Sequence, residues 1–105
     1  MIIDHTINFN DIKTLVKGKK IVLFGAGVVA KKFIKKFDKK QISFCLDNNK
    51  NLVNSELENI KIKDISEIKK KNFLRNYFIL ICTTSFNEVA NQLNKLGLKQ
   101  SINYS

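Results

Sequence analysis

The chain contains no proline, and it has no glycine- or serine-rich stretch and no internal repeat. Because such segments mark linkers and domain boundaries, no boundary can be placed here. A length of 105 residues is typical of one domain and leaves no room for a binding half plus a separate catalytic half. We therefore expect residues 1–105 to form a single domain, with a fragment of a longer protein as the open alternative.

Long apolar runs are also missing from the sequence. No run approaches the roughly 18 residues that a membrane-spanning helix needs. The N-terminus, Met1-Ile2-Ile3-Asp4-His5, lacks the basic start and the long apolar stretch of a secretory signal. These absences predict a cytoplasmic protein without a membrane span.

Residues with catalytic or metal-binding chemistry are few. The two cysteines, Cys45 and Cys82, lie in apolar runs without a Cys or His at metal-ligand spacing, so we expect buried, reduced thiols. The one histidine, His5, lies in the N-terminal arm and is expected to be exposed to solvent. No Ser/His/Asp set, paired carboxylates or Tyr-x-x-x-Lys pair can be assembled. The sequence therefore favours a binding domain over a complete enzyme.

Positive charge is abundant, but arginine is almost absent. The formal net charge is +10, and only Arg75 among the nineteen basic residues is not lysine. Base readout and bidentate phosphate binding favour arginine over lysine. We therefore expect no nucleic-acid partner, although a positive field would speed the arrival of an anionic small molecule.

Strand-like and helix-like patterns alternate along the chain. Continuous apolar runs predict strands, with shorter ones near the middle and the end, over 20–24, 42–46, 60–62, 77–82 and 102–104. Apolar residues at helical spacing predict helices over about 10–17, 28–39, 65–71 and 86–96. This alternation predicts an α/β three-layer domain with a mainly parallel sheet of about five strands, in the order 3-2-1-4-5.

Local signals accompany the predicted helix ends. Gly18 and Gly97 should end the first and the last helix. The segment Asp64-Ile65-Ser66-Glu67 has the spacing of a capping box, with Asp in place of the usual Ser or Thr. We expect it to begin the third helix.

A glycine turn joins the first predicted strand directly to a helix. Gly25 permits the tight turn, and Gly27 lets the backbone approach a phosphate. Ala26 lies between them, and the N–H groups that begin with Val28 form an anion site at the helix N-terminus. Ala30 is an allowed residue at the third position of the fingerprint. The turn predicts a Rossmann-like phosphate site, and a plain strand-to-helix connection is the alternative.

Other residues of the predicted site follow neighbouring strands. Asp47 lies twenty residues after Gly27 at the end of the second strand, where a carboxylate can accept hydrogen bonds from two ribose hydroxyls, and Asn48 is beside it. Thr83 and Thr84 follow the strand 77–82 and form a second wall of the predicted crevice. Alternatively, these hydroxyl residues cap the helix 86–96, with Ser85 as N-cap.

The chain resembles small Rossmann-like domains of bacterial surface-polysaccharide proteins, such as the N-terminal domain of sugar O- or N-acyltransferases. The resemblance rests on Ile21-Val22-Leu23-Phe24-Gly25-Ala26-Gly27, on Phe44-Cys45-Leu46-Asp47-Asn48-Asn49 and on the strand 77–82 followed by hydroxyl residues. It implies a domain that holds the nucleotide of a UDP-amino-sugar, with Gly25 and Gly27 at the diphosphate and Asp47 at the uridine.

The sequence departs from that family at several positions. The family's Gly-His-Gly after the second glycine is Val28-Val29-Ala30 here, and its second acidic residue is Asn48. The usual Gly before the third strand is Asn59, which tolerates a left-handed turn. The valines remove backbone freedom and a polar group beside the phosphates.

These features lead to one functional hypothesis and two alternatives. We expect a nucleotide- or nucleotide-sugar-binding module in bacterial surface-polysaccharide or glycoconjugate biosynthesis, with a UDP-sugar as the first candidate ligand and NAD as the second. The alternatives are the NAD-binding part of an oxidoreductase or epimerase, and a vestigial fold used for protein interaction. A homodimer or a partner catalytic domain is compatible with each of these readings.

Overall fold

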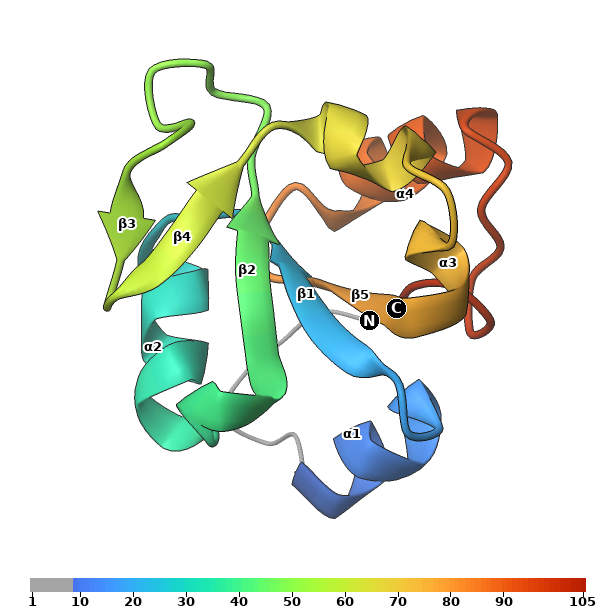
Figure 1. Ribbon diagram of the computed structural model, residues 1–105, viewed down its shortest axis with the longest axis horizontal. Helices are drawn as coiled ribbons and strands as arrows, with labels where there is room; N and C mark the ends of the chain where they lie inside the picture. Colours follow the sequence, from blue (N-terminus) through green and yellow to red (C-terminus); the bar gives the residue numbers. More distant parts are fainter. Residues whose placement is uncertain (1–8) are drawn as a thin grey trace.

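The computed structural model describes residues 9–105, and His5 therefore lies outside the described residues. Helices and strands alternate along most of this part of the chain, but three strands follow one another between residues 42 and 63 (Figure 1). The α-helices are α1 (Phe9–Val16), α2 (Val28–Lys36), α3 (Phe73–Asn76) and α4 (Phe86–Lys95), and the 3₁₀ helices are η1 (Lys39–Gln41) and η2 (Ile65–Lys69). The strands are β1 (Lys20–Phe24), β2 (Ile42–Leu46), β3 (Glu56–Leu57), β4 (Ile60–Lys63) and β5 (Tyr77–Ile81).

The five strands form one mixed sheet in the order β3-β4-β2-β1-β5 (Figure 1). The β4–β2, β2–β1 and β1–β5 pairs are parallel, as the alternation of strands and helices predicts, whereas β3 pairs with β4 in antiparallel orientation. The observed order therefore differs from the predicted 3-2-1-4-5, although the predicted strands 60–62, 42–46, 20–24 and 77–82 do lie side by side in that order, as β4, β2, β1 and β5. A two-residue strand precedes β4 and forms one outer edge, and the segment 102–104 does not form a full strand at the other.

The expected last strand is reduced to isolated bridges at Tyr104. Ile79 N–H donates to Asn103 O at 3.0 Å, Ser105 N–H donates to Ile79 O at 2.9 Å, and Ile81 N–H donates to Ser105 O at 2.8 Å. Tyr104 is fully buried, and its hydroxyl donates to Asn94 on α4 at 2.6 Å. The end of the described chain is thus fixed along the outer edge of β5.

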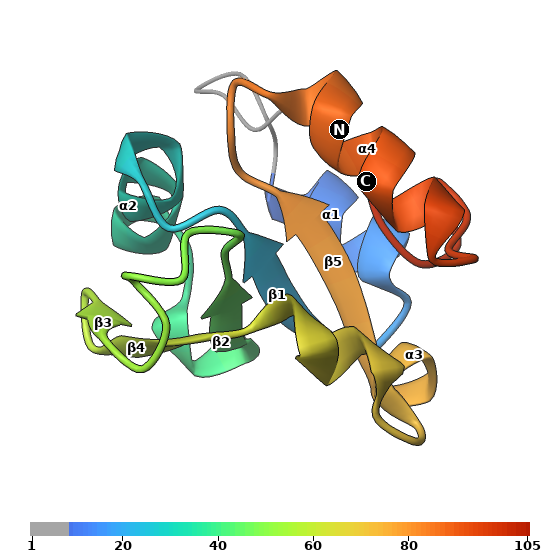
Figure 2. The same cartoon turned by 90° about the horizontal axis from the view of Figure 1, so that it is seen from above.

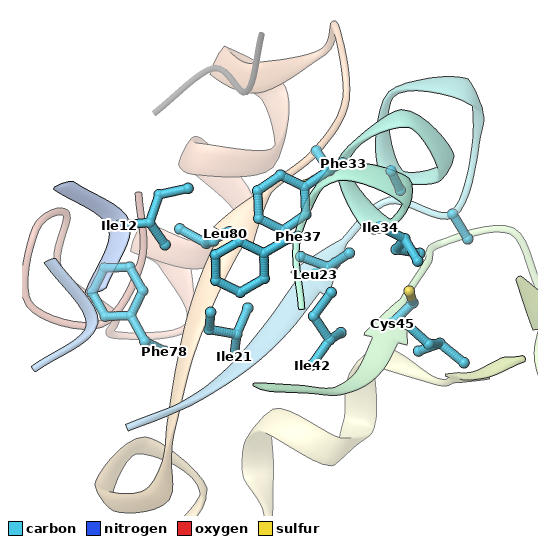
Figure 3. Packing of buried hydrophobic residues seen from close by; sticks show 14 of the residues in the cluster. Ile12, Ile21, Leu23, Phe33, Ile34, Phe37, Ile42, Cys45, Phe78 and Leu80 are labelled. Atoms are coloured by element: carbon cyan, nitrogen blue, oxygen red, sulfur yellow. The ribbon is translucent and has the colours of Figure 1, made fainter. Parts of the chain in front are cut away.

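Both faces of the sheet are covered by helices, which gives three layers. Along β1, Ile21 and Leu23 belong to one buried cluster, and Val22 and Phe24 belong to the other. The first cluster contains the apolar faces of α1 and α2, and Figure 3 shows Ile12, Phe33 and Phe37 of this cluster close to β1, β2 and β5. The second contains side chains of η2, α3 and α4. The continuous apolar runs of the sequence reflect this burial on both faces.

Helix boundaries differ from prediction where the chain must turn back to the sheet. The second helix ends at Lys36 rather than near 39, because Phe37 is extended and buried, and Asp38 begins η1 by accepting from Lys40 N–H. The third is 3₁₀ rather than α-helical and ends at Lys69.

The caps of these helices follow the sequence signals in part. Asp64 begins η2 by accepting from the N–H of Ser66, while the Glu67 carboxylate pairs with Lys70 instead of completing the capping box. The last helix ends as expected: Gly97 has φ +91°, and Leu98 N–H donates to Leu93 O at 3.1 Å. Gly18, after α1, also has a positive φ, of +80°. No helix among the described residues is long and apolar enough to cross a membrane.

Candidate functional site

The candidate site lies at the edge of the sheet where β1, β2 and β5 end. These strands are parallel neighbours, so the loops that follow them start side by side. Figure 2 shows the chain leaving β1 toward α2 on one side and leaving β5 toward α4 on the other. Because these two crossovers diverge, the ends of β1 and β5 form the switch point at which open α/β sheets bind ligands.

The fold itself requires a glycine at position 25. Its φ is +114°, and a Cβ built on it would lie 2.7 Å from the carbonyl oxygen of Cys82. Its N–H donates to Leu46 O at 2.7 Å, and Cys82 N–H donates to Phe24 O at 2.8 Å. The first glycine of the turn is therefore required for β1, β2 and β5 to close together at their ends, whether or not a ligand binds.

The fold does not require a glycine at position 27 in the same way. It is the N-cap residue of α2 with φ −104°, and a Cβ built on it would meet no atom within 4 Å. The first intrahelical bond of α2 runs from Lys31 N–H to Gly27 O, and the N–H groups of Gly27, Val28 and Val29 have no partner within residues 9–105. Three amides at the positive end of a helix thus face open space.

Asp47 is attached to the glycine turn. Its Oδ2 accepts from the N–H of Ala26 at 2.9 Å, and its Oδ1 accepts from the N–H of Asn49 at 2.8 Å. The carboxylate is therefore held in place by two backbone groups. Each oxygen can accept a further hydrogen bond. The sequence analysis predicts that the Asp47 carboxylate binds the hydroxyls of a ribose. In the structure the same carboxylate also stabilises the glycine turn through its hydrogen bond with Ala26 N–H.

The loop after β5 forms the opposite wall. Thr83 Oγ1 accepts from the N–H of Ser85 at 3.2 Å, which shapes the turn into α4. Ser85 is the N-cap residue of α4, as the capping alternative predicts, but its side chain makes no cap hydrogen bond. Thr84 is exposed. The hydroxyl groups of Ser85 and Thr84 are therefore not used in capping α4.

Two hollows of similar size open on either side of Asp47. The α2 hollow, about 320 Å³, is lined by the glycine turn, by Val28 and Val29, and by Thr83 and Thr84. The α4 hollow, about 310 Å³, is lined by Asn48, Ser85, Glu88 and Gln92, among others. Both hollows share three lining residues, Gly25, Asp47 and Thr83.

The structure thus brings all predicted site residues to the linings of these hollows, and within α4 it adds two polar residues that were not predicted. The predicted residues are Gly25, Ala26, Gly27, Val28, Asp47, Asn48, Thr83 and Thr84. The additions are Glu88 and Gln92, four residues apart on α4. Only the helical spacing of two polar residues near the start of α4 could have indicated them.

An amide pair forms part of the lining of the α4 hollow. Asn48 Nδ2 donates to Gln92 Oε1, and Gln92 Nε2 donates to Asn48 Oδ1, each at 2.9 Å. These two bonds connect the loop after β2 to α4. The carboxylate of Glu88, one helical turn before Gln92, has no partner within the described chain.

Lysine is absent from both hollows. Their ionisable lining groups are Asp47, Glu88 and the Cys82 thiol, and no Lys or Arg of residues 9–105 lines either one. Lysines gather instead around a larger hollow of about 560 Å³ at the opposite ends of the strands, lined by Lys13, Lys19, Lys20 and Lys40. Any anion in the two hollows would therefore be held by backbone N–H groups and not by cationic side chains.

Both cysteines are free and buried, as the sequence predicts. Burial, with the nearby Asp47 charge as a smaller cause, raises the pKa of the Cys45 thiol to about 12. Burial, followed by the proximity of Cys45, also raises the pKa of Cys82. Both thiols are therefore neutral at neutral pH, and a neutral thiol is a poor nucleophile. No group of three His, Cys, Asp or Glu residues within the described part of the chain could hold a metal ion.

Comparison with known proteins gives one family match. A family model described as C2185-like, N-terminal, matches residues 17–102, which contain all five strands and both hollows. No curated protein matches the chain.

Proposed function

The chain belongs to the C2185-like, N-terminal family, and from its two hollows we propose that it is a nucleotide-binding domain without a catalytic set of its own. The proposed ligand is a nucleotide or nucleotide sugar whose phosphates bind at the start of α2. In this proposal the fold is Rossmann-like, and the domain acts in the cytoplasm, in surface-polysaccharide or glycoconjugate biosynthesis. The resemblance of its motifs to the sugar-acyltransferase domains supports this role.

One observation carries the proposal: neither the φ of Gly27 nor the packing around it requires a glycine. Its φ is accessible to any residue, and its missing side chain leaves open space. A glycine at the start of a helix is needed where a phosphate approaches the backbone closely. The three unpaired N–H groups beside Gly27 are the donors that such a phosphate would use.

The charged groups that line the hollows limit which nucleotides the proposed site would bind. Without a lysine or arginine in the lining, the helix N-terminus is the source of positive potential there. That potential is equivalent to roughly half an elementary charge. The Asp47 carboxylate, which lines both hollows, and the Glu88 carboxylate, which lines the α4 hollow, repel additional anions. The site therefore favours a diphosphate without a further phosphate, and we expect NAD and UDP-sugars to bind more tightly than CoA or NADP.

A second candidate, a fold used only for protein interaction, is supported by Asp47. The bond from Ala26 N–H to the Asp47 carboxylate shows that this acid can be retained for the turn alone. In that case Asp47 would contribute to stability, and Gly27 would have no functional consequence.

Calorimetric titration separates these candidates. We expect UDP, a UDP-sugar or NAD to bind the full chain, and we expect Gly27→Val to weaken that binding at least tenfold without lowering the thermal unfolding midpoint by more than a few degrees. Asn91→Val, at an exposed position of α4 outside both hollows, is the matched control. If none of UDP, UDP-sugars, NAD and CoA binds at millimolar concentration, the proposed function is wrong and the second candidate is favoured.

A further inference from the structure

The α4 hollow differs chemically from the α2 hollow beside it. The α2 hollow presents backbone N–H groups and small side chains, which suit an anion. The α4 hollow presents two carboxylates, Asp47 and Glu88, and two carboxamides, Asn48 and Gln92. Carboxylates accept hydrogen bonds and cannot donate them, and carboxamides do both. This mixture suits neutral groups that carry several hydroxyls and disfavours a second phosphate.

We propose that the α4 hollow binds a hydroxylated ring of the ligand, with Glu88 and Gln92 of α4 as specificity-determining residues. The inference rests on the proposed function, because it assigns the part of the ligand that lies next to the phosphates. The ring is either the ribose of the nucleotide or the sugar attached to its diphosphate. Both sources present the same chemistry, a ring with adjacent hydroxyl groups.

The positions of the four polar residues support this assignment. Asp47 is oriented by the N–H groups of Ala26 and Asn49, so its remaining acceptor capacity has a fixed direction. The reciprocal amide bonds hold the Asn48 and Gln92 side chains against each other in the lining of the hollow. Pre-organised groups of this kind lose little entropy when a ligand binds.

Among the polar side chains of the α4 hollow, the Glu88 carboxylate lacks a partner in the described part of the chain. Glu88 has no hydrogen bond or ion pair within residues 9–105, although the chain carries many lysines. Its carboxylate lies in the first turn of α4, where it also interacts favourably with the helix dipole. That dipole effect would be weakened by Glu88→Gln without any dependence on the ligand, which separates it from a role in binding.

The α4 hollow also adjoins the α2 hollow, where the phosphates are proposed to bind. Gly25, Asp47 and Thr83 line both hollows, so a ligand can extend from one to the other along a shared wall. Each hollow of about 310 or 320 Å³ is at the lower end of the range for small-molecule sites, roughly 300–1,000 Å³. A single ring in one hollow and a diphosphate in the other are compatible with these dimensions.

The test compares three ligands on three forms of the full chain by calorimetry. The ligands are UDP, UDP-glucose and 2′-deoxy-UDP, and the proteins are wild type, Glu88→Gln and the matched control Glu56→Gln. Glu56 lies exposed on β3, outside both hollows, so its substitution removes the same charge elsewhere. Gln keeps an acceptor oxygen but loses the charge, so the change from a charge-assisted to a neutral hydrogen bond with a hydroxyl is expected to weaken binding by roughly tenfold.

The two sources of the ring give different patterns. If the ring is the attached sugar, Glu88→Gln lowers the affinity for UDP-glucose about tenfold and leaves the affinity for UDP unchanged. If the ring is the ribose, the wild-type protein binds UDP more tightly than 2′-deoxy-UDP. Glu88→Gln then lowers the affinity for UDP and reduces the difference between the two ligands. Either pattern supports the inference, provided that Glu56→Gln behaves as wild type.

Two further outcomes overturn the inference and differ in what else they overturn. If the wild-type protein binds UDP and UDP-glucose but Glu88→Gln changes neither affinity, Glu88 does not bind ligand hydroxyl groups in the α4 hollow and the inference is wrong. The proposed function would still stand. If no ligand binds to wild type, the proposed function fails and this inference fails with it.

Discussion

Replacing Gly25 with alanine should destabilise the protein far more than the same replacement at Gly27. At Gly25 the new Cβ would lie 2.7 Å from the carbonyl oxygen of Cys82, which is backbone directly after β5 and cannot rotate away as a side chain could. The φ of +114° adds strain of roughly 1–3 kcal/mol. Moving Cys82 away would also weaken its hydrogen bond to Phe24, at about 1 kcal/mol. We therefore expect Gly25→Ala to lower the free energy of unfolding by about 2–4 kcal/mol.

Equilibrium unfolding in urea measures this difference. With a slope of about 1.5 kcal/mol per molar urea, the Gly25→Ala midpoint should fall by roughly 1.3–2.7 M. Gly27→Ala is the matched control, because its Cβ meets no atom within 4 Å and its φ is ordinary. We expect its change to lie within about 1 kcal/mol of zero, since a less flexible unfolded chain offsets a poorer N-cap. Equal midpoints for the two variants would refute this account of the turn.

Two further predictions concern ionisable groups. The hydrogen bond from Lys50, followed by those from Ser66, lowers the pKa of Asp64 from 3.8 to about 2. This stabilisation is present above pH 3.8 and is lost as the pH falls toward 2, so the wild-type urea midpoint should decrease more between pH 5 and pH 2 than that of Asp64→Asn; parallel decreases would contradict it. Because burial raises the thiol pKa values of Cys45 and Cys82, neither should react with a thiol reagent at pH 8 unless urea unfolds the chain. Rapid modification of the native protein would show that one thiol is accessible.

The sequence predicts β1, β2 and β5 well because burial on both faces of the sheet leaves a continuous apolar run in each strand. β1 and β2 have the predicted bounds, 20–24 and 42–46, and β5 ends one residue earlier than predicted. The edge strand β3 leaves no such signal, since it has two residues and pairs through a turn with positive φ at Glu58 and Asn59. Its formation depends on its neighbour β4 and not on its own composition.

The candidate site shows a similar division. The residues of the glycine turn and Asp47 follow strands directly, and parallel strands bring their ends together, so their proximity is predictable from the order of elements. Glu88 and Gln92 belong to the polar side of an amphipathic helix. Periodicity separates the polar side from the apolar side, but it does not say which polar residues face a hollow and which face open solvent. That distinction requires the position of α4 relative to β2.

The two outer edges of the sheet have a consequence for how copies of the molecule meet. An exposed strand edge offers unpaired N–H and C=O groups to another chain and promotes aggregation. At one edge β3 is only two residues long and carries the exposed Glu56. At the other, the backbone of 103–105 already occupies hydrogen-bonding groups of β5. Neither edge presents a long template, so we expect the folded domain to resist growth into intermolecular sheets even at high concentration.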